Sequence, residues 1–156
     1  MTTKKMAIIA TKGALDMAYP PLILASTAAA LGWEVQVFFT FYGLQLLRKD
    51  LSGIAISPIG NPAMPMPVPM PVVVSMLPGM EAMATSMMKA KMKKKGVASL
   101  EELRSVCLEA EVKFIACQMT VDLFEFSKSD FIEGIDYGGA ATFLQFAGET
   151  DVCLFI

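Results

Sequence analysis

Residues 5–40 read KMAIIATKGALDMAYPPLILASTAAALGWEVQVFFT, and the hydrophobic pattern of this stretch decides the fold. The short apolar run 5–10 is typical of a buried strand that ends in a turn. The alanine- and leucine-rich segment 15–31 predicts a helix that ends at Gly32, and residues 34–40 are again β-branched and aromatic. A strand, a helix and a second strand in this order predict a parallel pair joined by a right-handed crossover.

The rest of the chain continues this alternation, so we expect one α/β domain spanning residues 1–156 with a mostly parallel sheet. Pro20 and Pro21 are tolerated only in the first turn of a helix, so the first regular helix is expected to start near them. The further elements that the patterns predict are helices at 42–48, 80–92, Ser99 to about Ala110, 120–126 and 140–147, and strands at 113–117 and 151–156.

Residues 61–80 read NPAMPMPVPMPVVVSMLPGM, a composition that cannot form an ordinary helix. Within it, residues 72–76 are a candidate short strand. We interpret the methionines and prolines as an apolar contact surface for an oligomer or a partner. The lysines within 89–95 add a second possibility, contact with an anionic membrane, although a solvated helix end is favoured over either.

Composition excludes several kinds of chemistry. The chain has 156 residues, of which 54% are hydrophobic, and this apolar fraction points to an oligomer. The formal net charge of -2 gives no basic field for nucleic acid. There are 3 cysteines and 0 histidines, which argues against a disulfide framework, a histidine-based zinc site and a Cys-His pair. We expect no cofactor and no bound metal.

The chain begins MTTKKMAIIA, which runs into a strand pattern rather than into a signal-peptide pattern. We therefore expect a cytoplasmic protein.

Cys117 is the strongest candidate for chemistry, because it ends a predicted parallel strand just before a helix. Open α/β sheets bind their ligands at the carboxyl ends of the strands. A helix N-terminus near Thr120 lowers the pKa of a nearby thiol and so favours the nucleophilic thiolate. The alternative is a buried structural cysteine, and on these patterns alone the two interpretations are even.

Three other positions carry weaker predictions. Lys12 and Gly13 follow the first strand without forming a nucleotide-binding motif, so an ordinary turn is the simplest interpretation. In a doubly wound sheet that turn lies at the same edge as Cys117, and Lys12 would then favour a thiolate or persulfide. Cys107 has helical neighbours typical of a core position, with a second relay thiol as the alternative, and Cys153 is expected to pack in the core.

Four segments together resemble the DsrE/DsrF-like family, in its branch with a Met- and Pro-rich insertion, here about residues 57–95. They are KMAIIATKGALDMAYPPLILASTAAALGWEVQVFFTFYGLQLL (5–47), SMLPGMEAMATSMMKAKMKKKGVASLEEL (75–103), KFIACQMTVDLFEF (113–126) and GGAATFLQFA (138–147). The resemblance implies a flavodoxin-like five-stranded sheet with helices on both faces, homo-oligomers and cysteine persulfide chemistry.

In this family the active cysteine lies in a segment like CQMTVDLF, which implies that Cys117 is catalytic. From their expected positions beside it, Lys12, Gly13 and Thr120 are the candidate substrate-binding residues. Some members have a second upstream cysteine, which implies a secondary role for Cys107. The resemblance leads us to expect glycine where Glu125 stands. It implies partners that donate and accept sulfur, rhodanese-like and TusA-like proteins.

Two functional hypotheses follow. The first is a sulfur carrier or sulfurtransferase that relays sulfane sulfur or thiosulfonate on a cysteine persulfide between partner proteins. The alternative is a non-catalytic oligomeric interaction module that uses the Met/Pro-rich segment. Association with a membrane is a third option, which is not favoured. The rate of alkylation of Cys117 against pH separates the first two, because only the first predicts a lowered thiol pKa.

Overall fold

The computed structural model describes residues 2–58, 68 and 71–156. Its strands are β1 (Lys5–Ala10), β2 (Glu34–Phe39), β3 (Lys113–Cys117), β4 (Asp136–Gly138) and β5 (Val152–Phe155). Its α-helices are α1 (Leu15–Ala30), α2 (Val72–Ser75), α3 (Met80–Lys94), α4 (Leu100–Glu109), α5 (Gln118–Leu123) and α6 (Ala140–Ala147). Two 3₁₀ helices, η1 (Phe41–Leu47) and η2 (Lys128–Asp130), follow β2 and α5.

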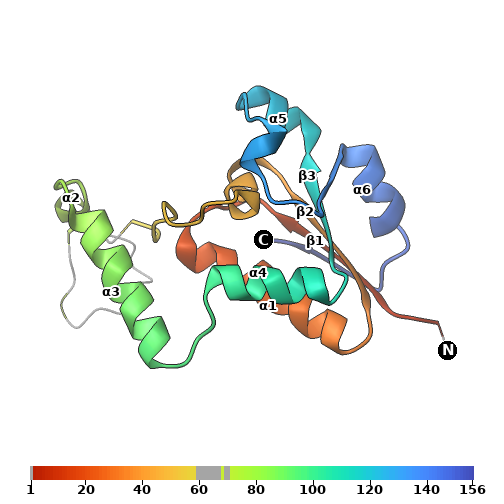
Figure 1. Ribbon diagram of the computed structural model, residues 1–156, viewed down its shortest axis with the longest axis horizontal. Helices are drawn as coiled ribbons and strands as arrows, with labels where there is room; N and C mark the ends of the chain where they lie inside the picture. Colours follow the sequence, from red (N-terminus) through yellow and green to blue (C-terminus); the bar gives the residue numbers. More distant parts are fainter. Residues whose placement is uncertain (1, 59–67, 69–70) are drawn as a thin grey trace.

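The five strands form one parallel sheet in the order β4-β3-β2-β1-β5. The predicted five-stranded α/β fold is therefore confirmed. Within this class, the order differs from the 2-1-3-4-5 order of flavodoxin itself. Because β1, β2 and β3 are neighbours and run in the same direction, the loops that follow their carboxyl ends lie at the same end of the sheet (Figure 1).

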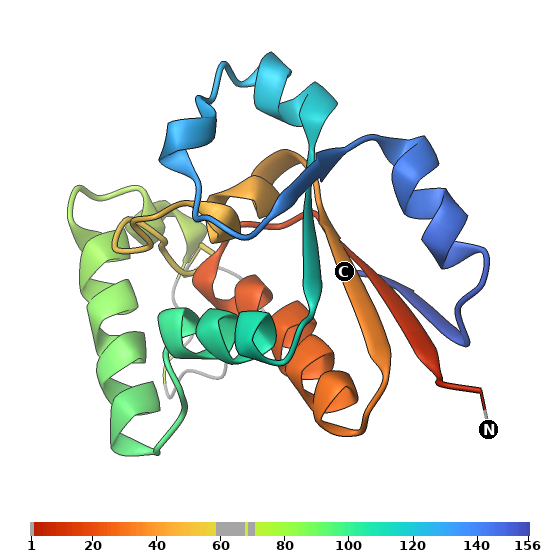
Figure 2. The same ribbon diagram turned by 45° about the vertical axis from the view of Figure 1, so that its right-hand side comes forward.

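Helices cover both faces of the sheet. Helices α1 and α4 pack together on one face, and α6 lies on the other (Figures 1 and 2). Alternation along the strands separates two clusters: Phe39 and Phe114 belong to the large core under α1 and α4, whereas Phe38 and Ile115 lie in a small cluster under α6. The ring of Phe143 from α6 stacks on Phe38 with centroids 5.1 Å apart.

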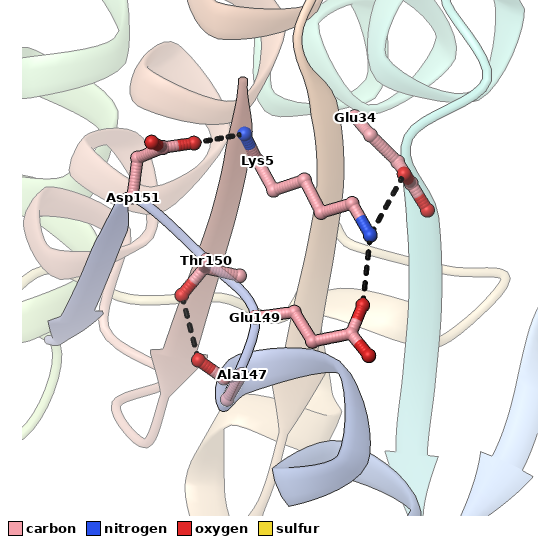
Figure 3. Close-up of polar contacts among 6 residues, drawn as sticks. All are labelled: Lys5, Glu34, Ala147, Glu149, Thr150 and Asp151. Carbon is pink, nitrogen blue, oxygen red and sulfur yellow. Dashed lines mark hydrogen bonds and ion pairs between the residues drawn. The ribbon is translucent and has the colours of Figure 1, made fainter. Parts of the chain in front are cut away.

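Polar contacts tie down the amino ends of β1 and β5, at the edge opposite to Cys117. The backbone N–H of Lys5 donates to Asp151 (2.8 Å), and its ammonium donates to Glu149 (3.0 Å) and lies 3.8 Å from Glu34 (Figure 3). The Thr150 hydroxyl donates to the carbonyl of Ala147 (2.8 Å) and so fixes the turn after α6. The contacts of Lys5 are exposed, so they contribute little to the stability of the fold.

Helix α1 begins earlier than the prolines predicted. It starts at Leu15, with Pro20 and Pro21 in its second turn rather than its first. Tertiary contacts account for the difference: the N–H of Leu15 donates to the carbonyl of Ala55 (2.7 Å), and Tyr19 is buried. Packing therefore outweighs the two hydrogen bonds that the prolines cannot donate.

The predicted end of α1 is confirmed, since Gly32 has φ +80° and ends the helix in the left-handed conformation. The predicted cap of α4 is confirmed as well. The hydroxyl of Ser99 accepts from the N–H of Glu102 (3.1 Å), and the Glu102 carboxylate accepts from the N–H of Ser99 (2.7 Å). This reciprocal pair is a capping box.

Two local predictions are wrong. Residues 72–76 are not a strand, because Val72–Ser75 form the short helix α2 directly before α3. Most of the surrounding Met/Pro-rich stretch lies outside the described residues. The helix predicted at 120–126 starts two residues earlier, at Gln118, and ends at Leu123, with Cys117 as its N-cap.

The last strand differs from the buried strand that the sequence predicts. In β5 the side chains alternate between partly buried and exposed; Phe155 is 74% exposed, and Cys153 is exposed rather than packed in the core. The reason is topological, because β5 forms the edge of the sheet beyond β1.

None of the helices described is both long enough and apolar enough to span a bilayer.

Candidate functional site

Cys117 lies at the junction of β3 and α5: it is the last residue of the strand and the N-cap of the helix. Its side chain belongs to the small cluster under α6 and is 5% exposed. On one side it pairs in register with Gly138 of β4, which has no side chain. On the other side Phe39 pairs with Ala116, so the next residue, Thr40, lies beside Cys117.

Two threonine hydroxyls meet at this junction. The Oγ1 atoms of Thr40 and Thr120 are 3.1 Å apart, within hydrogen-bond distance. The N–H of Phe41 donates to Thr120 Oγ1 (3.3 Å). Thr120 is completely buried, so its hydroxyl has no contact with solvent and must form its hydrogen bonds with protein groups.

The surroundings of Cys117 lower its pKa. Burial, the largest single influence, raises the pKa, but the hydroxyl and backbone N–H of Thr120, the hydroxyl of Thr40 and the N–H of Met119 together outweigh it. The Cys117 side chain does not form a capping hydrogen bond with the N–H groups of α5. The donors therefore influence the sulfur by lying close to it. Donors directed at a sulfur favour its anionic form. The thiol is therefore predisposed to ionise.

This pKa gives a testable pH dependence. In a Cys153→Ser variant, which removes the exposed thiol, alkylation of Cys117 by iodoacetamide is expected to accelerate with pH and to reach half its maximal rate below the pH at which a cysteine in an unfolded peptide does. The rate tracks the thiolate fraction, which a lowered pKa increases near neutral pH. A profile that matches the unfolded peptide would contradict the assigned environment.

Cys107 has the opposite environment. It is completely buried between α1 and α4, its Sγ donates to the carbonyl of Leu22 (3.4 Å), and burial raises its pKa to about 11. It lies in the large core, on the other face of the sheet from Cys117. The structure therefore does not bring the two thiols together, and the surroundings of Cys107 are those of a packing residue.

Lys12 and Gly13 lie in the turn after β1, two strands away from Cys117. The Lys12 side chain is exposed and is not among the groups that shift the pKa of Cys117. Gly13 has a packing role, because a Cβ there would lie 2.5 Å from the carbonyl oxygen of Tyr42. The structure brings Thr120 to the sulfur and leaves Lys12 and Gly13 at the end of β1, two strands away.

Exposed apolar side chains surround the junction. Met119 and Leu123 on α5 are both 60% exposed, and Tyr42 on η1 is 66% exposed. The ring of Phe124 stacks with Tyr42 at 6.1 Å and meets Phe41 edge-on at 6.3 Å. These five residues, Phe41, Tyr42, Met119, Leu123 and Phe124, are called the apolar rim below. Such a patch is typical of a surface that receives another molecule.

Metal ligation is not supported by the residues described, among which no three His, Cys, Asp or Glu side chains cluster as a metal site would require.

Glu125, just after α5, occupies a backbone conformation that favours glycine. Its φ is +55°, in the left-handed region that costs a side-chain-bearing residue about 1–2 kcal/mol. Glu125→Gly is therefore expected to stabilise the protein by roughly 0.5–1 kcal/mol, measured by urea unfolding, after the greater flexibility of unfolded glycine is counted. Glu133→Gly, at an exposed loop position without positive φ, is the control and should destabilise by a similar amount. A loss of stability in Glu125→Gly would contradict this account.

Two site features were not predicted from the sequence. The first is the pair Thr40 and Phe41, which directly follows β2. The second is the short strand β4, which carries Gly138 and has too few residues to show a hydrophobic period. The signal for Thr40 is positional: it follows the carboxyl end of the strand that neighbours β3. Phe41 has φ +48°, which is rare for an aromatic residue and typical of strained functional sites.

The structure is an open α/β domain with a parallel sheet, and a thiol of lowered pKa lies at the carboxyl end of β3. The chain belongs to the DsrE/DsrF/DrsH-like family, whose profile matches residues 2–155. It is 66% identical over 160 residues to the sulfur carrier protein DsrE2 of Allochromatium vinosum, with 100% of both chains covered. It is 35% identical over 159 residues to the uncharacterized protein YrkE of Bacillus subtilis, covering 99% of this chain and 98% of that protein.

Among solved structures, the ychN protein from E. coli has a similar fold, with a TM-score of 0.56 at 12% identity over 99% of this chain and 100% of that one. At this identity the likeness concerns the fold alone.

Proposed function

We propose that this protein is a sulfur carrier that holds sulfane sulfur as a persulfide on Cys117. The observation that carries the proposal is the position of Cys117 between β3 and α5, where the two threonines and the start of α5 lower its pKa. The 66% identity to a protein named as a sulfur carrier, over the full length of both chains, supports the same function.

The chemistry needs no cofactor. The Cys117 thiolate attacks the outer sulfur of a donor persulfide, an S–S bond forms to Cys117, and the donor's own S–S bond breaks. The electron pair leaves with the donor, which departs as a thiolate, and no external oxidant or reductant takes part. In the second step an acceptor thiolate attacks the outer sulfur, and Cys117 leaves as the thiolate. An S–S bond is about 2.05 Å long, so the transferable sulfur lies that far beyond Sγ.

The same proposal includes partner proteins in the cytoplasm, a rhodanese-like donor and a TusA-like acceptor, and a homo-oligomer. The apolar rim supports protein docking next to the thiol, and the exposed Phe155 on edge strand β5 supports contact with another copy. Residues 57–95 are proposed as an insertion within a single domain of residues 1–156. In this scheme Cys107 is a packing residue.

A transfer experiment tests the proposal. The protein is loaded with polysulfide, freed of excess donor by desalting, and mixed with a TusA-like protein that carries one reactive cysteine. The acceptor is expected to gain one sulfur atom while the carrier returns to its unloaded mass, as seen by intact mass spectrometry. An acceptor that stays unmodified while the carrier remains loaded would argue for storage and against relay.

A further inference from the structure

Thr40 lies next to Cys117 across the β2–β3 pair. The pairing of Phe39 with Ala116 makes Thr40 and Cys117 the next residues along, and alternation places them on the face that carries Phe38 and Ile115. The Thr40 side chain is half-buried, whereas that of Thr120 is completely buried.

The hydrogen bonds between Thr40, Thr120 and Phe41 allow only two arrangements of the two hydroxyl protons. A hydroxyl has one proton to donate, and Thr120 Oγ1 already accepts from the N–H of Phe41. If Thr40 donates to Thr120, the Thr120 proton is free for the sulfur; if Thr120 donates to Thr40, the Thr40 proton is free instead. In both arrangements one hydroxyl proton is available to the sulfur and the two threonines act as a unit.

The backbone of Phe41 supports this arrangement. Its φ of +48° is unfavourable for an aromatic residue, and the same conformation aims its N–H at Thr120 Oγ1. The contact occupies one acceptor position of Thr120 and thereby limits where its proton can point. The fold thus keeps a strained residue where it orients the threonine pair.

We propose that Thr40 is a positioning residue of the sulfur site, whose hydroxyl, paired with that of Thr120, holds the Cys117 sulfur as an anion before loading and the persulfide anion after it. This inference rests on the proposed function.

The test compares Thr40→Val, which keeps the shape and removes the hydroxyl, with Thr40→Ser, which keeps the hydroxyl. Both are made in a Cys153→Ser background, and iodoacetamide alkylation of Cys117 is followed against pH. Thr40→Val is expected to move the curve to higher pH and to slow alkylation at neutral pH by up to about tenfold, because the Thr120 hydroxyl loses the partner that fixes where its proton points. Thr40→Ser is expected to restore the parent curve.

A second pair guards against a folding defect. Thr40→Ala and Thr40→Ser both lack the methyl group and differ only in the hydroxyl, so a difference in their pH curves cannot come from lost packing. Identical curves for the parent, Thr40→Val and Thr40→Ala would overturn the inference. Polysulfide loading of the parent is measured in parallel: failure there refutes the carrier function, whereas normal loading with unchanged curves refutes only the role of Thr40.

Discussion

Cys117→Ser is expected to abolish sulfur loading. The serine hydroxyl cannot form a persulfide, and the structure offers no substitute at the same place, since Cys107 lies on the other face of the sheet in full burial. After exposure to polysulfide and desalting, intact mass spectrometry should find Cys153→Ser carrying added sulfur and Cys117→Ser/Cys153→Ser at its unmodified mass.

Cys153 needs its own control, because it is exposed and can react with sulfur donors without belonging to the site. Cys153→Ser is expected to load like the parent, and the double variant Cys117→Ser/Cys153→Ser should not load at all. Loading of that double variant, with sulfur on Cys107, would contradict the assignment of Cys107 to packing.

Gly43→Ala is expected to destabilise the protein by about 3 kcal/mol, because the backbone leaves no room for a side chain there. A Cβ on Gly43 would overlap the carbonyl oxygen of Ala10, lie 2.8 Å from its carbon and approach the N–H nitrogen of Thr11 to 3.3 Å. These are backbone atoms at the end of β1, which cannot move without disturbing the sheet. The midpoint of urea unfolding is the measurement.

The same substitution should also reach the thiol. Gly43 donates its N–H to the carbonyl of Thr40 (3.0 Å), so displacing η1 displaces Thr40 and slows alkylation of Cys117. Gly53→Ala is the matched control, because a Cβ there meets nothing within 4 Å, and it should leave the urea midpoint and the alkylation rate unchanged. A Gly43→Ala protein as stable as Gly53→Ala would contradict the close packing of η1 on β1.

Much of the fold is predictable because its strongest signals are local. The strands β1, β2 and β3 are short apolar runs, and the Ser99 capping box and the Gly32 terminus depend on nearest neighbours. Predictions fail where distant contacts decide. Helix α1 extends past its prolines because Leu15 bonds to Ala55, far along the chain. The exposure of Cys153 follows from the edge position of β5, which no local pattern reveals.

The residues of the site also fall into those that local sequence predicts and those that only distant contacts bring together. Cys117 can be found because a thiol at a strand–helix junction is a local pattern, and Thr120 follows it by three residues. Thr40 lies 80 residues from Thr120 in sequence, and the two meet only because β2 and β3 pair in one register. The strain at Phe41 likewise exists only in the assembled structure.

Cys117 is proposed to carry the transferred sulfur atom, and mapping the position of the added sulfur tests this most directly. The wild-type protein is loaded with polysulfide, its persulfides are alkylated to trap them, and the proteolytic peptides are assigned by tandem mass spectrometry. The trapped sulfur is expected on the peptide that contains Cys117. Its appearance only on the peptides of Cys107 or Cys153, with Cys117 unmodified, would contradict the account.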